Sequence, residues 1–342
     1  MSQSLTVSSR SGGIANGDFR RCLERVIEQE RGARCTIANF ARRPVGQART
    51  RGPEVLTVRL AAGGSMRLFI KLASEARAAA VGGNRWDRER QVYGDLLAGA
   101  PLDTPRFHGS GWDPRRERSW LLLEFVSGDR LRWQDLDHFV AAAAWLGRMQ
   151  SHFASHPDRP RACALLDRHD ASFFQAWADR ARAAARGITA PLQDRLLRLV
   201  DRHEPWIEGM AAGPPTVVHG SFRRRHVLVE RGSDPPRIRP VGWEWAALGS
   251  PLFDLAFLSE GVRPPTLERM WMAYRDARNQ GGLEAPDWET MERLTACFRI
   301  HRVFRQLAEP PAERLSPAEA GRLVQRAERL ADALEEGVLY AR

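Results

Sequence analysis

Alternating apolar and polar residues predict a β-hairpin in the first third of the chain. Residues 54–60, EVLTVRL, and 66–72, MRLFIKL, are rich in β-branched and large apolar side chains, and AAGG at 61–64 separates them. Two such runs around a glycine-containing turn are typical of a hairpin. Lys71 is expected near the end of the second strand. Residues 120–126, WLLLEFV, are apolar apart from Glu124, which indicates a further strand that is buried.

Helical spacing appears between these strands and dominates after them. In residues 87–97, DRERQVYGDLL, the apolar residues recur at helical intervals, and Glu89 precedes Tyr93 by one turn on the same face. After Ser127-Gly128-Asp129 most of the pattern is helical. The expected helices cover residues 138–153, 170–186, 192–202 and 267–278, and another begins at a capping box, Ser316 to Glu319.

These elements predict an α+β protein of two lobes. Residues 1–126 are expected to form a small lobe with an antiparallel sheet and one main helix, and residues 127–342 a large, mainly helical lobe. Residues 1–15 are polar and rich in small side chains, so we expect them to be a flexible tail.

Composition narrows the functional classes. The formal net charge is +10, but Lys71 is the only lysine, so 51 of the 52 Lys and Arg residues are arginines. Such a bias fits an arginine-favouring coding background, and the arginines are scattered, so nucleic acid is not an expected partner. Where arginine serves everywhere else, a retained lysine indicates a need for an ammonium group on a slim, flexible stem.

Nothing in the pattern indicates a membrane protein or a secreted one. The longest apolar run, near residues 140–146, is far shorter than a bilayer span, and the first residues lack the apolar core of a signal peptide. The cysteines at 22, 35, 163 and 297 show no CxxC spacing, so we expect reduced thiols, no metal site and a cytoplasmic location.

Five segments in order resemble the aminoglycoside phosphotransferase and choline kinase family. They are LFIK, RERQVY, LLLEFVSG, HGSFRRRHVLVE and VGWEWAALGSPLFDLAFL, and together they cover roughly residues 40 to 310. The resemblance implies a protein-kinase-like fold. It also implies that Lys71 holds the α- and β-phosphates of ATP, and that Glu89 pairs with this lysine. The main chain of Glu124 and Val126 would bind the adenine edge.

The catalytic segment departs from the family pattern. His219 matches the first residue of the catalytic loop, and the resemblance implies an acid two residues later, an asparagine five residues after that, and an aspartate before the Trp-Glu pair. This chain has Ser221, His226 and Gly242 there instead. The first change removes the carboxylate that orients or deprotonates the acceptor hydroxyl. The other two remove the side chains that hold magnesium, which prefers anionic oxygen ligands.

Charged residues near these positions leave alternatives open. Arg223, Arg224 and Arg225 could neutralise a polyphosphate without magnesium, since guanidinium groups bind phosphate bidentately. They could equally be background arginines on a solvated loop. Glu244 is two residues from Gly242, and on a strand it would share the same face and could replace the lost metal ligand.

Three hypotheses follow for the function. The first is a pseudokinase that binds a nucleotide, another anionic small molecule or a protein partner without efficient phosphoryl transfer. The second is an active ATP-dependent small-molecule phosphotransferase that uses Glu244 or His226. The third is a binder of nucleic acid or an acidic partner, which would need arginines clustered with stacking aromatics. ATP is the expected cofactor under the first two, and magnesium is not expected under the first.

Overall fold

The computed structural model describes residues 16–32, 34–45, 53–74, 84–113, 118–308 and 315–337. The chain divides into two compact units, the first comprising Met1–Asp129 and Leu228–Trp245, the second Arg130–Val227 and Ala246–Arg342. The boundary expected after Val126 lies instead after Asp129, and residues 228–245 return to the first unit. The predicted tail, residues 1–15, lies outside the described residues.

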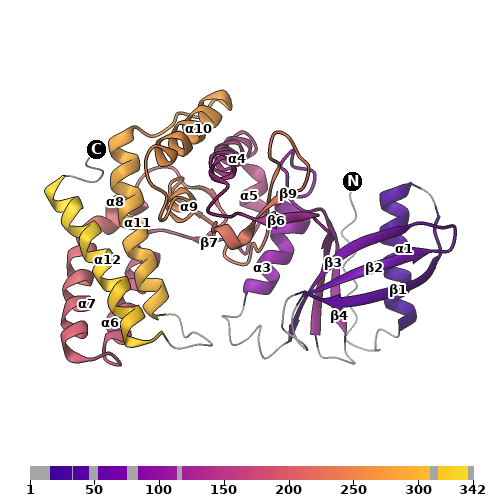
Figure 1. Ribbon diagram of the computed structural model, residues 1–342, viewed down its shortest axis with the longest axis horizontal. Helices are drawn as coiled ribbons and strands as arrows, with labels where there is room; N and C mark the ends of the chain where they lie inside the picture. Colours follow the sequence, from indigo (N-terminus) through magenta and orange to yellow (C-terminus); the bar gives the residue numbers. More distant parts are fainter. Residues whose placement is uncertain are drawn as a thin grey trace. The chain divides into compact units, whose positions relative to one another are not determined.

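The first unit contains a five-stranded antiparallel sheet in the order β1-β2-β3-β5-β4 (Figure 1). The predicted hairpin is β2 and β3, with Leu56 opposite Leu68. The strand bounds are β1 Ile37–Pro44, β2 Glu54–Leu60, β3 Ser65–Ser74, β4 Phe107–Asp113 and β5 Arg118–Glu124. Strand β5 pairs with β3 on one side and β4 on the other, which explains the continuous apolar run of its sequence.

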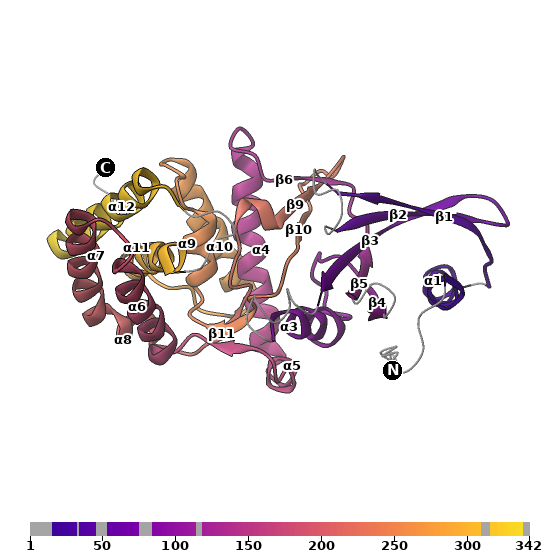
Figure 2. The same cartoon turned by 90° about the horizontal axis from the view of Figure 1, so that it is seen from below.

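Helix α1, Asn16–Arg31, covers one face of this sheet (Figure 2). Its buried side chains, among them Leu23 and Ile27, pack against Leu68 and Ile70 of β3. The helix predicted over residues 87–97 is α-helical as α3, Arg85–Gln91, and then continues as a π-helical turn over Val92–Leu96.

A smaller sheet joins the returning segment to the first unit. It has the order β10-β9-β6, from β6 Gly128–Arg130, β9 Val227–Glu230 and β10 Ile238–Pro240. A Cβ on Gly128 would lie 2.5 Å from the carbonyl oxygen of Val229, so this approach of β6 to β9 requires glycine.

The second unit is mainly helical, as predicted. A short sheet in the order β7-β11-β8 lies among the helices, from β7 Asp167–Arg168, β8 Thr216–Val218 and β11 Ala247–Gly249. The helices are α4 Leu136–Ser155, α5 Asp158–Ala162, α6 Ala171–Ala185, α7 Ala190–His203, α8 Ile207–Ala211, α9 Phe253–Leu258, α10 Thr266–Gln280, α11 Trp288–Ala308 and α12 Pro317–Glu336.

Helices α6, α7, α11 and α12 share one apolar core (Figure 1). The capping box predicted at the start of α12 is present, since Ser316 and Glu319 bond each other's main chain. Within the described residues, no helix is long and apolar enough to cross a bilayer. Cys35, Cys163 and Cys297 are free thiols, and the side chain of Cys22 lies outside the described part.

Candidate functional site

Lys71 forms the centre of a charged group in the first unit. Its ammonium Nζ lies 2.6 Å from Oε2 of Glu89 on α3, so the ion pair expected from the sequence is present. Nζ also lies 3.2 Å from Oε2 of Glu244. Alternation along β3 explains this placement: Ile70 is buried in the core shared with α1, so the side chain of Lys71 leaves the opposite face of the strand.

The two carboxylates control the protonation of Lys71. Burial lowers the pKa of the ammonium, but Glu89 and Glu244 outweigh burial and raise it above its ordinary value. Lys71 therefore stays protonated at neutral pH. Burial also raises the pKa of the Glu89 carboxyl, to about 7, and the Lys71 ammonium opposes that change. The Glu244 carboxylate lies 3.2 Å from Nζ, so a phosphate that approached Lys71 would also meet the charge of Glu244.

Helix α3 places Glu244 through the residues on one of its faces. Arg85, Arg88 and Glu89 are three and four residues apart and therefore share that face. The guanidinium Nη1 of Arg88 donates to the carbonyl oxygen of Glu244 at 3.1 Å. The guanidinium of Arg85 lies 3.3 Å from the ring centroid of Trp245. Helix α3 thereby holds the main chain of Glu244 and the ring of Trp245, and the Glu244 carboxylate lies beside Lys71.

The local backbone at Gly242 corrects one expectation. Strand β10 ends at Pro240, and Gly242 has a φ of 82°. A left-handed residue rotates the chain, so the argument that Glu244 and position 242 share a strand face is wrong. Glu244 reaches Lys71 through a turn that only the structure reveals.

The two residues predicted to contact adenine, Glu124 and Val126, lie at the end of β5 and just after it. The amide of Glu124 donates to the carbonyl oxygen of Arg106 at 2.8 Å, so it is already engaged. The carbonyl of Val126 accepts from the amide of Gly128 at 3.0 Å, and within the described part of the unit the Val126 amide has no partner. Val126 is thus the residue of the two whose amide stays free for a ligand.

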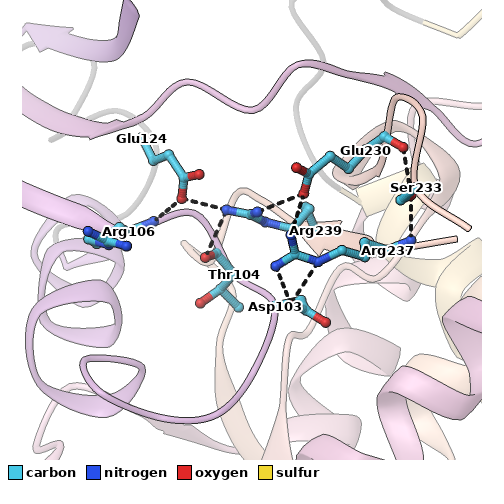
Figure 3. Close-up of polar contacts among 8 residues, drawn as sticks. All are labelled: Asp103, Thr104, Arg106, Glu124, Glu230, Ser233, Arg237 and Arg239. Carbon is cyan, nitrogen blue, oxygen red and sulfur yellow. Dashed lines mark hydrogen bonds and ion pairs between the residues drawn. The ribbon is translucent and has the colours of Figure 1, made fainter. Parts of the chain in front are cut away.

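A network of ion pairs joins β10 to the end of β5 (Figure 3). The buried Arg239 donates to Glu124 at 2.5 Å and to Glu230 at 2.9 Å. Its neighbour Arg237 donates to Asp103 at 2.7 Å. These bonds explain why residues 228–245 belong to the first unit, although they come after helices α4 to α8 of the second unit in the chain.

The loop after β8 begins the candidate catalytic segment in the second unit. His219 is buried, and the main-chain amides of His219 and Gly220 donate to the carboxylate of Asp254, at 2.5 and 3.0 Å. Burial raises the pKa of Asp254 to about 7, and these amides together with Arg305 oppose the change. Asp254 therefore holds the start of the loop in place.

The side chains at positions 221 and 226 are engaged by neighbouring arginines and by the main chain. The Ser221 hydroxyl oxygen accepts from Arg223, 2.9 Å from Nη2 and 3.2 Å from Nε. Nδ1 of His226 lies 2.7 Å from the carbonyl oxygen of Ser221, which can only accept, so this nitrogen carries the proton. Nε2 of His226 accepts from Nε of Arg225 at 3.1 Å. Both imidazole nitrogens are thus engaged.

The three consecutive arginines do not act as one group. Arg223 turns to Ser221 and Arg225 to His226, whereas the guanidinium of Arg224 stacks 4.3 Å from the ring centroid of Trp133. The 3₁₀ turn over Arg224–His226 points successive side chains in different directions. Among the described residues, no group of three or more His, Cys, Asp and Glu side chains is arranged to hold a metal ion.

Comparison with known proteins identifies the family. A model described as a phosphotransferase enzyme family matches residues 47–294, which is more than half of the chain. The chain belongs to this family. No curated protein matches it at a significant level.

Solved structures with a similar fold are numerous but distant in sequence. A putative aminoglycoside phosphotransferase from Ralstonia eutropha is 15% identical, with a TM-score of 0.58 over 93% of this chain and 97% of the other. A microcompartment-associated aminopropanol kinase is 15% identical, with a TM-score of 0.56 over 88% and 94%. A thermostable mutant of aminoglycoside phosphotransferase APH(4)-Ia, solved with ADP and hygromycin B, is 13% identical, with a TM-score of 0.54 over 91% and 98%. These likenesses support the kinase-like α+β fold.

Proposed function

We propose that this member of the phosphotransferase family is a pseudokinase, which binds a nucleotide without efficient phosphoryl transfer. The observation that supports this proposal is that the side chains of Ser221 and His226 are already engaged in hydrogen bonds within the protein. A serine hydroxyl bonded to a guanidinium stands where the family has an acid, and an imidazole with both nitrogens engaged stands where it has an asparagine. Gly242, at the third position, has no side chain.

The chemistry of phosphoryl transfer explains why these changes matter. Catalysis depends on positioning and on metal ions that neutralise the developing charge. Loss of one well-placed electrostatic group typically costs about 10²–10³ in rate. The three positions offer no anionic oxygen, so we expect very little transfer even though the losses are not additive.

The first unit supports nucleotide binding of modest strength. Lys71 keeps its charge and its partner Glu89, and the Val126 amide is free to meet an adenine edge. Related structures are described as complexes with ADP or GDP. A phosphate must, however, displace the carboxylate of Glu244 from Lys71, so binding should be weak. It should also not require magnesium.

A thermal-shift titration with ATP tests the proposal directly. Ligand that binds the native state raises the melting temperature by mass action. We expect the same small rise with ATP plus EDTA as with ATP plus magnesium, and a loss of that rise in Lys71→Ala. Magnesium-dependent consumption of ATP by the wild-type protein would refute the pseudokinase.

Restoration of the family residues is a second test. Ser221→Asp with His226→Asn returns an acid and an amide to the loop, and Gly242→Asp adds the third group at a φ of 82°. Aspartate tolerates the left-handed region better than most residues, at a cost of about 1 kcal/mol. The triple variant should gain magnesium-dependent ATP binding that the wild type lacks. A triple variant that folds but responds to ATP like the wild type would show that the rest of the scaffold is not competent.

An active phosphotransferase is the second candidate, and one contact favours it. Glu244 lies 3.2 Å from Lys71 and keeps about a quarter of its side chain exposed, so its carboxylate could turn to a metal ion bound to phosphate. This candidate requires ATP consumption that depends on both magnesium and Glu244. We further propose a cytoplasmic location, which the free thiols of Cys35, Cys163 and Cys297 favour.

A further inference from the structure

Several arginines of the second unit gather around a single carboxylate. Arg302 of α11 contacts Glu260, which follows α9, and Nη2 of Arg326 on α12 lies 2.7 Å from Oε1 of the same carboxylate. One acid is thereby shared between two guanidinium groups. Further arginines approach from the loop after β8 and from the next turn of α11. We use the term arginine cluster for Arg223, Arg225, Arg302, Arg305 and Arg326.

Arg302 and Arg326 share the single carboxylate of Glu260, so positive groups outnumber negative ones at that contact. Burial lowers the pKa of the Arg302 guanidinium to about 9, and the four other arginines of the cluster lower it further by repulsion. Asp254, the acid beside Arg305, already accepts from the amides of the loop after β8. Positive groups that are pressed together against mutual repulsion are well suited to a ligand that supplies negative charge.

Other arginines of the second unit each pair with two acids, whereas two arginines share one acid at Glu260. Arg182 pairs with both Asp201 and Glu204. Arg202 likewise pairs with two acids of α12. In these pairs the protein supplies two carboxylates for one guanidinium, whereas around Glu260 it supplies one for two. The imbalance therefore belongs to the arginine cluster and does not simply follow from an arginine-rich composition.

The cluster extends from the surface into the protein. Arg225 is exposed and the Arg326 side chain keeps 45% of its surface, whereas Arg302 keeps 15% and Arg305 is buried. Within the described residues, Nε of Arg302 and Oε1 of Gln306, one turn further along α11, are buried without a hydrogen-bond partner. Buried polar atoms nearly always have partners, so the Nε–H donor of Arg302 fits a position that an anionic ligand completes, whereas the Gln306 oxygen requires a water or another donor.

We propose that the arginine cluster binds a small molecule with two or more negative charges, carried by phosphate or carboxylate groups. Both groups match the planar fork of a guanidinium, which can hold two of their oxygens at once. Every residue of the cluster belongs to the second unit, whereas Lys71 belongs to the first, so separate variants test this ligand and the proposed nucleotide. The inference therefore holds whether or not the nucleotide proposal does.

Calorimetric titration with pyrophosphate and with citrate, at an ionic strength fixed with sodium chloride, tests the inference. Arg326→Gln removes an accessible guanidinium, and Arg302→Lys keeps the charge but loses the fork. Loss of one hydrogen-bonded charged contact should weaken binding about tenfold or more in each variant. Arg269→Gln is the matched control, because Arg269 is also half-exposed and bonded to one acid, Asp137, at 2.6 Å. It should bind both probes like the wild type.

The possible results separate the inference from the nucleotide proposal. Saturable binding of pyrophosphate alone supports a phosphate ligand, and of citrate alone a carboxylate ligand. In either case Lys71→Ala should retain that binding while it loses the response to ATP. The inference would be overturned if titration with pyrophosphate or citrate released no more heat than titration with sodium chloride. Equal affinities of Arg326→Gln and Arg269→Gln for these probes would also overturn it. Melting temperatures without ligand identify any variant that is merely unfolded.

Discussion

Replacement of Glu244 by glutamine separates the two candidate functions, because they predict opposite results. Glutamine has nearly the same shape as glutamate, so the change removes a charge and leaves a possible hydrogen bond to Lys71. In a pseudokinase, Glu244 competes with phosphate for the ammonium, and its neutralisation should strengthen binding of ATP without metal. In an enzyme with a relocated metal ligand, the same change should abolish magnesium-dependent turnover.

The geometry gives the size of the effect. At the 3.2 Å between Lys71 Nζ and Glu244 Oε2, Coulomb's law with an effective dielectric constant of about 20 gives roughly 5 kcal/mol as an upper limit. About a quarter of the Glu244 side chain and a third of the Lys71 side chain are exposed, so solvent screens much of this energy. A hydrogen bond to a charged group is typically worth about 1.5–3 kcal/mol net. Glutamine retains part of it, so we expect about 1.4 kcal/mol, or a tenfold gain in ATP affinity.

The assay is calorimetric titration with ATP in EDTA, alongside an ATP-consumption assay with magnesium. Asp129→Asn is a suitable control, since it removes one acid from the same unit, where Asp129 pairs with the exposed Arg231 at 2.9 Å. The control should bind ATP like the wild type. Unchanged or weaker ATP binding in Glu244→Gln would refute the competition between Glu244 and phosphate, and lost turnover would establish the active enzyme.

Two further predictions concern stability. Burial lowers the pKa of His203 to about 4, below the ordinary 6.5, so its stabilising contribution is present above pH 6.5 and is lost as the pH falls toward 4. This loss amounts to about 3 kcal/mol, and urea unfolding at several pH values should show a shallower decline for His203→Leu than for the wild type. Arg239→Met removes the hydrogen bonds of a buried guanidinium to the partly exposed carboxylates of Glu124 and Glu230 and should cost about 1.5–3 kcal/mol in chemical denaturation. Arg237→Met, at a half-exposed site, should cost at most about 1 kcal/mol, and equal losses would contradict the role given to burial.

The sequence by itself determined the elements and one half of the charged group at Lys71. Alternation along 54–60 and 66–72 predicted β2 and β3, because side chains on a strand face opposite sides with a period of two. The resemblance to the phosphotransferase family, matched at Lys71 and Glu89, implied the ion pair that the structure contains. The substitutions at Ser221, His226 and Gly242 were equally visible, since they follow from residue identity and order alone.

Tertiary structure decided which distant residues meet these elements. Glu244 reaches Lys71 because Gly242 turns the chain and α3 holds the segment that follows, and neither effect has a local signature. The side chains of Arg223 and Arg225 diverge because a 3₁₀ turn separates them. Arg302 and Arg326 meet at Glu260 only because α9, α11 and α12 pack together. Periodicity reports which face of an element is buried, whereas contacts between elements far apart in the chain depend on packing, and the charges of this protein are paired by packing.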